Sequence, residues 1–260
     1  MTETEDLMMD VMAELTLARA PIVFKGAMTL KLALAKQENL PVSRNTKDLD
    51  GDWMLAGVTM DQMEEFLSNA IHNIDPSLSV IPFRAFDKDK SAGFRIVDSM
   101  NQIIFKIDLG IRPVQSVEKF DLCYKGKYIS IHGASINKML ADKICAISSP
   151  KVFRRSKDLV DAYILSHTAR FNFLEVFRLV HTNGKKLEDF HAFRTNKEDL
   201  QHAYEKLHGV ENKPEFSALY ERLETFLAPF IEKKLRPIVW TGKTWVVPQR
   251  STENQKNMER

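Results

Sequence analysis

Cysteine is scarce in this chain, and its scarcity excludes two structural classes. Only Cys123 and Cys145 occur among 260 residues, and each lies in an apolar stretch. Two isolated thiols cannot build a disulfide framework, and the seven histidines show no spacing that would complete a zinc site. We therefore expect both cysteines to be reduced residues of the hydrophobic core.

Long hydrophobic runs are also missing. No apolar segment approaches the roughly 20 residues that a transmembrane helix needs. The N-terminus carries Glu3, Glu5 and Asp6, where a secretory signal peptide has basic residues. The sequence therefore predicts a cytoplasmic protein with no membrane partner.

Neither sign of charge predominates. Lys and Arg number 37 against 35 Asp and Glu, which gives a net charge of +2, and 44% of the residues are hydrophobic. This composition is that of an ordinary soluble globular protein, long enough to bury a sizeable core. Any surface that binds nucleic acid must be a local cluster of basic residues.

The most informative stretch that is present runs from Ile22 to Trp53. A β-branched and aromatic run, Ile22 to Phe24, breaks at Lys25-Gly26-Ala27 and passes into a helical pattern of leucines. The pattern predicts a strand, a small-residue turn and a helix. Backbone N–H groups at the start of such a helix are able to bind phosphate.

A pair of aspartates follows in the same stretch. Asp48 and Asp50 flank Leu49 within a second predicted strand, and side chains two apart in a strand project from the same face. Two carboxylates on one face are suitable ligands for a divalent cation and the phosphates that it neutralises. The alternative is a solvated strand edge, where such pairs are common.

A third carboxylate lies in the middle of the chain. Asp108 alternates with hydrophobic neighbours in the predicted strand from Ile103 to Ile111, so a buried position is expected. It is either a third metal ligand or a partner in a salt bridge to Arg95 or Arg112.

The remaining pattern predicts an α+β fold. A first helix is expected over 6–17, and another begins at Thr59 with Gln62 completing a capping box. Strands dominate residues 78–131, with a hairpin turn at Lys125-Gly126-Lys127, and helices dominate from 135 onward. We predict a mixed β-sheet flanked by helices (residues 1–133), a mostly helical domain that completes the active-site cleft and ends in a short hairpin (134–248), and a disordered tail (249–260).

Charged residues recur on the helices after the sheet. Lys143 lies in the first, and Asp158 and Asp161 lie three residues apart on the next, where they are surface neighbours. By chemistry alone, this run is a solvated charged face. Gly242-Lys243-Thr244 is not a Walker A motif, because Pro237 occupies the required glycine position.

Together these residues carry a family resemblance. The strand, Lys25-Gly26, the helix and the segment Arg44-x-Thr46-x-Asp48-Leu49-Asp50 resemble the DNA polymerase beta-like nucleotidyltransferase superfamily, and more narrowly the AbiEii/AbiGii type of toxin. The chain departs from the family in having Ala27 and Met28 after Gly26, where Gly-Gly-Thr or Gly-Ser is usual. Thr29 would then supply the missing hydroxyl one position later.

The resemblance implies roles for the charged residues. Asp48, Asp50, Lys143 and Asp158 would be catalytic, with Asp161 as the competing assignment for Asp158. Nucleotide contacts would come from the turn and from the helical half, and metal contacts from the strands: Lys25, Gly26, Ala27, Thr29, Lys143 and Asp161 for the nucleotide; Asp48, Asp50 and Asp108 for the metal. Mg²⁺ is the expected cofactor, with Mn²⁺ as the alternative.

The resemblance also implies an activity: a nucleoside monophosphate would pass from a nucleoside triphosphate to a hydroxyl of RNA, which in some members of the family is the acceptor end of transfer RNA. A toxin of this kind would be encoded with a cognate antitoxin. Two alternatives stay open. One is a regulatory protein that keeps the fold without the chemistry, which the altered Gly26-Ala27-Met28 turn favours. The other is transfer to a small molecule such as an antibiotic.

Overall fold

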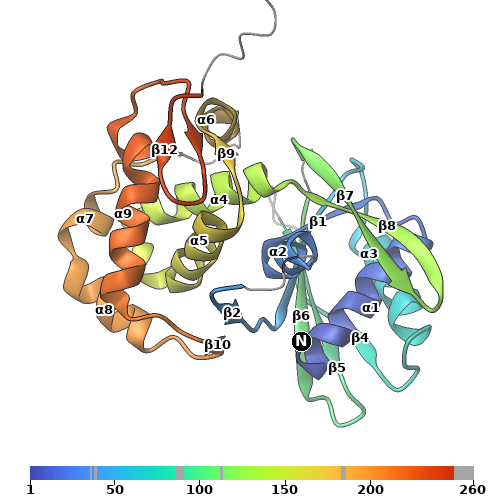
Figure 1. Cartoon of the computed structure of the whole chain (residues 1–260). Coiled ribbons are helices and arrows are strands. Elements are labelled where there is room, and N and C mark those ends of the chain that lie inside the picture. The colour runs from blue at the N-terminus through green and yellow to red at the C-terminus, as the bar shows by residue number, and fades with distance from the viewer. Residues whose placement is uncertain (36, 38–39, 86–90, 112–113, 183–185, 249–260) are drawn as a thin grey trace, which may run out of the picture. The chain divides into compact units, whose positions relative to one another are not determined.

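The computed structural model describes residues 1–35, 37, 40–85, 91–111, 114–182 and 186–248. The chain divides into two compact units (Figure 1). The first contains Met1–Asp142 and Lys206–Lys213, and the second contains Lys143–Glu205 and Pro214–Arg260.

A seven-stranded mixed sheet forms the centre of the first unit. Its strand order is β4-β5-β6-β3-β1-β8-β7, which places β3 in the middle. The β3–β6 and β1–β8 pairs are parallel, and the other pairs are antiparallel. The strands are β1 (Ile22–Lys25), β3 (Asp48–Trp53), β4 (Ser79–Arg84), β5 (Ser91–Val97), β6 (Ile103–Ile111), β7 (Val117–Tyr124) and β8 (Lys127–Ala134).

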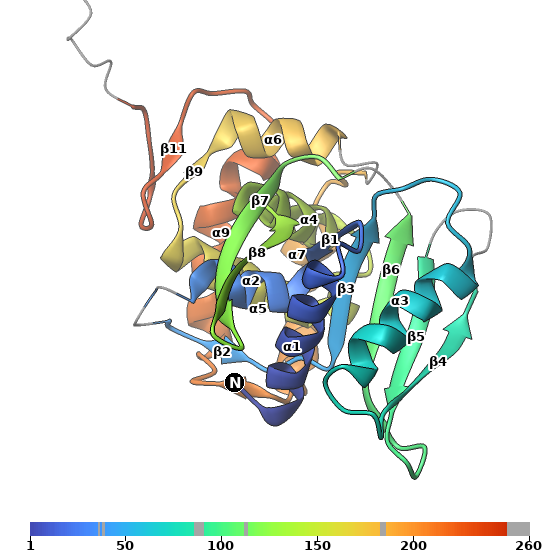
Figure 2. The same ribbon diagram turned by 90° about the vertical axis from the view of Figure 1, so that its right-hand side faces the viewer.

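Two helices, α1 (Glu3–Leu17) and α3 (Met60–His72), pack side by side over one face of this sheet (Figure 2). Alternate side chains of the central strands, such as Leu49 and Ile107, are buried in the core beneath them. Helix α2 (Gly26–Leu34) begins directly at the end of β1, as the turn at Gly26 predicts. The short strand β2 (Ser43–Arg44) pairs with β10 (Val210–Glu211).

Helix starts follow the capping residues. The predicted capping box of Thr59 and Gln62 is present at α3. Helix α1 starts at Glu3 rather than Asp6, because Thr2 and Glu5 form a second capping box that the prediction missed.

The second unit is mostly helical, as predicted. Helix α4 (Ile136–Ser148) enters it at Lys143. In the described part of this unit, a short 3₁₀ turn, five more helices and three short strands follow. These are η1 (Val152–Arg154), α5 (Ser156–Thr168), α6 (Phe173–Thr182), α7 (His191–Thr195), α8 (Lys197–Glu205), α9 (Phe216–Glu232), β9 (Phe171–Asn172), β11 (Val239–Trp240) and β12 (Trp245–Val246). The predicted hairpin is β11–β12, and β9 extends it to three strands.

The prediction for the cysteines was half right. Cys145 is buried, but Cys123 is exposed, because Phe120, Leu122 and Tyr124 take the inward positions of β7 and leave Cys123 on the outer face. The predicted tail 249–260 lies outside the described residues. None of the helices that the structure describes has the length and hydropathy that a bilayer span requires.

Candidate active site

Three aspartates project from one face of the central strand. Asp48, Asp50 and Asp52 alternate along β3 with Leu49, Gly51 and Trp53, which take the core side. Asp48 and Asp50 are half-buried, whereas Asp52 is buried. The shared face expected for Asp48 and Asp50 follows from their positions in this strand.

The neighbouring strands add charged residues to the same face. In the strand register, Asp50 stands opposite Lys25 of β1 on one side and Asp108 of β6 on the other. Directly opposite residues share a face, so these three side chains form a row across adjacent strands about 4.8 Å apart.

Asp50 also lies against the start of α2. Gly26 has a φ of +74°, and a Cβ at this position would be 2.4 Å from Oδ2 of Asp50. Glycine is therefore required for two reasons: its left-handed backbone and the close approach of the carboxylate. The structure thus brings together the turn and one of the two aspartates that the sequence singled out.

Lys25 forms an ion pair with Asp52. Sequence reasoning missed Asp52, although its position two residues after Asp50 indicates that it shares the same face. The pair fixes the Lys25 side chain beside the carboxylates, with 23% of that side chain exposed.

The expectation for Asp108 needs correction. It is not a buried carboxylate: 33% of its side chain is exposed, because it points away from the core that Ile107 and Leu109 enter. Its ion-pair partner is Arg84 of β4 rather than Arg95, and Arg112 lies outside the described residues.

Thr29 is not available to a phosphate in this structure. Its side chain is fully buried, and its methyl group lies where a Cβ on Gly133 of β8 would be 2.6 Å away. Packing of α2 on β8 therefore takes Thr29 out of the nucleotide contacts that the sequence suggested. Ala27 is also buried, which leaves only its backbone for such a contact.

The carboxylates of Asp48 and Asp50 are hard oxygen donors of the kind that Mg²⁺ takes. Within the described residues, no three or more His, Cys, Asp or Glu side chains converge to hold a metal ion. Mg²⁺ keeps several waters and is commonly bound by one or two carboxylates plus substrate phosphates. Asp48 and Asp50 fit that requirement, with Asp108 in register beside Asp50.

The charged residues of the second unit form a buried cluster of their own. Nζ of Lys143 on α4 lies 2.8 Å from Oδ1 of Asp158 and 2.7 Å from Oδ2 of Asp161, both on α5. Oδ2 of Asp158 also pairs with Nε of Arg155 at 2.7 Å. The run is therefore not the solvated face that plain chemistry favoured: the side chains of Asp158 and Asp161 are only 9% and 1% exposed.

These contacts set the charge of Lys143. Burial alone would lower its pKa, but Asp161 and Asp158 outweigh that effect and raise the pKa above its usual value. The ammonium therefore stays protonated at physiological pH.

A family model matches the part of the chain that contains the aspartates of β3, the turn at Gly26 and the Lys143 cluster. The model described as "Nucleotidyl transferase AbiEii toxin, Type IV TA system" matches residues 10–235, which include every candidate residue named above. The chain belongs to the AbiEii family of nucleotidyltransferase toxins. It is thus a nucleotidyltransferase of the toxin–antitoxin class.

Solved structures share the fold of this AbiEii protein. MenT4, a nucleotidyltransferase toxin from Mycobacterium tuberculosis H37Rv, is 15% identical with a TM-score of 0.55, and the match covers 97% of this chain and 90% of that one. JHP933 from Helicobacter pylori is 16% identical with a TM-score of 0.51, over 90% of this chain and 94% of that one. No curated protein matches the chain at a significant level.

Sequence reasoning also missed Glu5, which supports the aspartate segment of this AbiEii chain. Its fully buried carboxylate accepts hydrogen bonds from the Thr46 backbone N–H at 2.9 Å and from Lys31 Nζ at 3.0 Å. Burial would raise its pKa, but the hydrogen bonds from Thr2, Lys31 and Thr46 lower it below the usual value. Glu5 thereby ties α1 to α2 and to the residues just before Asp48.

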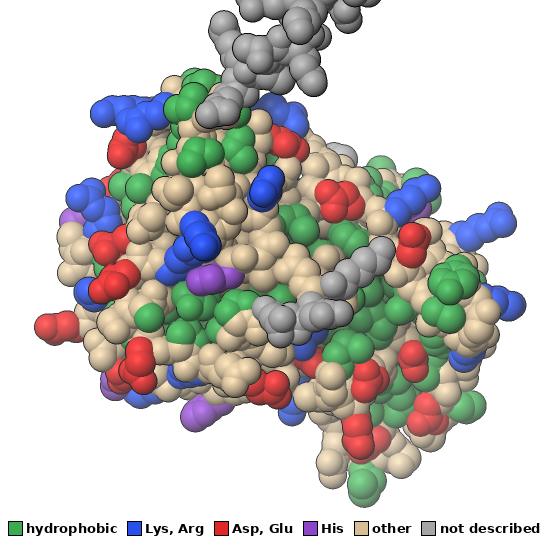
Figure 3. All heavy atoms as spheres, viewed as in Figure 1, with side chains coloured by type: hydrophobic (Ala, Val, Ile, Leu, Met, Phe, Trp, Pro, Cys, Tyr) green, Lys and Arg blue, Asp and Glu red, His purple; other side chains and the backbone are tan. Residues whose placement is uncertain are grey.

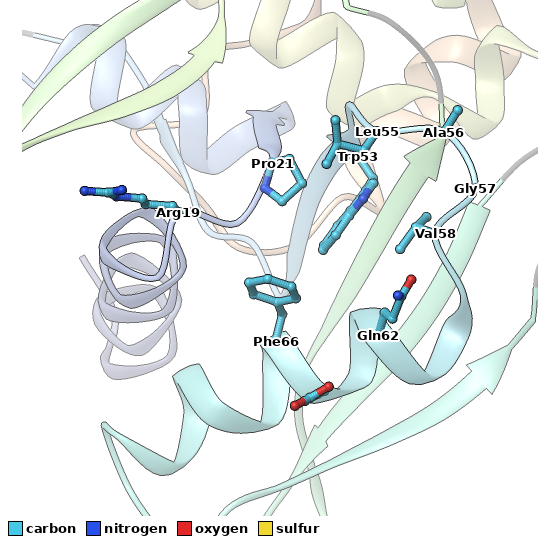
Figure 4. Close-up of a pocket in the computed structure, with 10 residues that line it drawn as sticks. Arg19, Pro21, Trp53, Leu55, Ala56, Gly57, Val58, Gln62 and Phe66 are labelled. Carbon is cyan, nitrogen blue, oxygen red and sulfur yellow. The ribbon is translucent and has the colours of Figure 1, made fainter.

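A pocket of about 530 Å³ lies elsewhere in the first unit. Figure 4 shows Trp53 of β3 and Phe66 of α3 pointing toward one another, with Pro21 and Val58 on either side. Because Trp53 alternates with Asp52, this pocket lies on the opposite face of β3 from the aspartates. Its mainly apolar lining does not suit a triphosphate.

Proposed function

We propose that this AbiEii protein transfers a nucleoside monophosphate from a nucleoside triphosphate to an RNA hydroxyl, in a reaction that depends on Mg²⁺. The hydroxyl oxygen forms a bond to the α-phosphorus, the bond between the α- and β-phosphates breaks, and pyrophosphate leaves. One observation carries the proposal: Asp48 and Asp50 share a face of the central strand, and the Asp50 carboxylate lies against the glycine that starts α2. Carboxylates beside a helix N-terminus join a cation site to a phosphate site.

Each residue of the first unit has a proposed task. Asp48 and Asp50 would hold the cation, Mg²⁺ or Mn²⁺ in its place, which would supply positive charge against the charge that develops on the triphosphate. The absence of a side chain at Gly26 lets the phosphates approach the backbone of residues 26 and 27. Lys25, held by Asp52, adds positive charge beside them.

Asp108 has two candidate tasks in this proposal. Its carboxylate stands in register with Asp50 and is paired with Arg84. If Arg84 paired with a substrate phosphate instead, the Asp108 carboxylate would be available to hold the cation or to accept the proton of the attacking hydroxyl.

For the second unit, we propose that Lys143 contacts a phosphate oxygen. Its ammonium is a compact charge that stays protonated, and Asp158 and Asp161 orient it. Asp158 is the better candidate for the active-site acid, since its side chain is less deeply buried than that of Asp161.

The acceptor and the biological setting are also proposals. We propose that the acceptor is RNA, specifically transfer RNA, that modification blocks translation in the cytoplasm, and that a cognate antitoxin relieves the block. Membership of a type IV toxin–antitoxin family supports the antitoxin.

The test is incubation with each labelled nucleoside triphosphate, Mg²⁺ and total cellular RNA. We expect label from one triphosphate to enter a defined RNA, and no label to enter with Asp50→Asn or when EDTA is added. Labelling of small molecules only would assign a different acceptor. Unchanged growth arrest by Asp50→Ala would instead indicate a regulatory protein without this chemistry.

A further inference from the structure

Phe83 stands out on the aspartate face of the sheet because three cations surround its ring. The centroid lies 5.7 Å from Cζ of Arg84, 4.9 Å from Cζ of Arg95 and 5.8 Å from Nζ of Lys106. On the face that Figure 3 shows, basic and acidic side chains are interspersed, in keeping with a net charge of +2. We call Phe83, Arg84, Arg95 and Lys106 the Phe83 surface.

Strand register joins the Phe83 surface to the proposed catalytic aspartates. The Phe83 ring lies over Gly93 of β5, where an added Cβ would be 2.7 Å from the ring. Gly93 stands opposite Asp108, and Asp108 stands opposite Asp50. Gly93, over which the Phe83 ring lies, is therefore two strand spacings, about 10 Å, from Asp50.

A second row of directly opposite residues places a basic side chain one strand spacing from an aspartate of β3. Arg95 stands opposite Lys106, and Lys106 stands opposite Asp48. These residues alternate with core residues such as Phe94, Ile107 and Leu49, so the two rows share the aspartate face. Arg95 and Lys106 therefore lie in one row with Asp48, on the same face of the sheet.

The chemistry of this surface points to a polyanion with flat rings. Three cations around one ring repel one another, and within the described residues only Arg84 has an ion-paired carboxylate, that of Asp108. Phosphates relieve such crowding, while bases stack on aromatic rings and on guanidinium planes. Bases are available for stacking only where a strand is unpaired.

We infer that the Phe83 surface binds the single-stranded end of the RNA acceptor, with a base stacked on Phe83 or Arg95 and a phosphate on Lys106. The inference rests on the proposed function for its acceptor. It adds the residues that hold the RNA and its single-stranded form.

Direct binding tests the inference without requiring transfer. A fluorescent single-stranded RNA oligonucleotide and its duplex are titrated with the full chain, with EDTA present and no nucleotide, and anisotropy is recorded at several salt concentrations. The variants are Phe83→Leu, Arg95→Gln and Lys106→Gln. The matched controls are Phe153→Leu, an exposed phenylalanine beside Arg154 in the second unit, and Lys119→Gln, an exposed lysine of β7.

The wild type is expected to bind the single strand more tightly than the duplex. Phe83→Leu should weaken single-strand binding about tenfold, the effect of losing one stacked base. Lys106→Gln should reduce the slope of log K against log salt by about 0.7, the value for one phosphate contact on a single strand. The controls should match the wild type.

Three results would overturn the inference: no RNA binding by the wild type, equal losses in the controls, or unchanged binding by folded Phe83→Leu, Arg95→Gln and Lys106→Gln. Binding that depends on Phe83 without nucleotide transfer would refute the proposed function and leave the surface standing. If the protein transferred nucleotide to RNA and these variants did not change the KM for RNA, the proposed function would stand and the role of the Phe83 surface would be refuted.

Discussion

At the scale of single residues, Gly26 is required both for its left-handed backbone and for the close approach of the Asp50 carboxylate. Gly26→Ala should cost about 1–2 kcal/mol of stability through its left-handed backbone, and should also displace the Asp50 carboxylate that lies 2.4 Å from the new Cβ. We therefore expect at least a tenfold loss of nucleotide transfer.

Gly126→Ala is the matched control. Gly126 has the same φ of +74°, but an added Cβ there meets nothing within 4 Å. Urea unfolding should show similar losses of stability for the two variants, and transfer assays should show a loss for Gly26→Ala alone. Equal activities would mean that the approach of Asp50 to Gly26 has no catalytic consequence.

Glu5 gives a prediction about pH. Because its folded-state pKa is lowered from the ordinary value of 4.5, Glu5 stabilises the fold above that pH, and the contribution is lost as pH falls through the lowered pKa. Glu5→Gln should cost about 2 kcal/mol at pH 7, as expected for hydrogen bonds to a charged group, and less at pH 3.

Urea unfolding at pH 7 and pH 3 checks this. Glu3→Gln is the control, because Glu3 occupies the same first turn of α1 but is exposed. If Glu5→Gln lost as much stability at pH 3 as at pH 7, the carboxylate would not be the source of the effect.

At the scale of elements, Lys143 joins α4 to α5. Lys143→Met should leave Asp158 and Asp161 buried without their shared cation, and breaking a buried ion pair in this way costs about 3–5 kcal/mol. Arg236→Met, which removes an exposed i,i+4 pair with Glu232, should cost less than about 0.5 kcal/mol. Similar losses in urea unfolding would contradict a structural role for Lys143.

Features that depend on local sequence patterns were predictable from the sequence alone. The common face of Asp48 and Asp50 was predictable, because the alternation of a strand is local. The capping box of Thr2 and Glu5 was readable in the same way and was missed.

Contacts between distant segments were not predictable. The partnership of Asp108 with Arg84 depends on the order β4-β5-β6-β3, which no local pattern encodes. The burial of Thr29 depends on the packing of α2 against Gly133. The Phe83 surface was missed for the same reason, since its cations come from three strands.

At the scale of the whole molecule, the chain belongs to a family of toxins, and the proposed site on β3 predicts that growth arrest requires its aspartates. Expression of the wild type should arrest bacterial growth, whereas Asp48→Asn and Asp50→Asn at equal protein levels should not. Asp61→Asn, an exposed acidic residue of α3, should arrest growth like the wild type. Growth curves with immunoblots provide the measurement, and arrest by all variants would show that toxicity does not need the aspartates.

The most direct measurement of the central claim is metal binding itself. Electron paramagnetic resonance of Mn²⁺, titrated into the full chain with a non-hydrolysable nucleoside triphosphate analogue, reports how much ion is bound. We predict a bound ion in the wild type and in Asp61→Asn, and its loss in Asp48→Asn and Asp50→Asn. Equal Mn²⁺ binding by all four proteins would contradict a metal–triphosphate site on the aspartate face of β3.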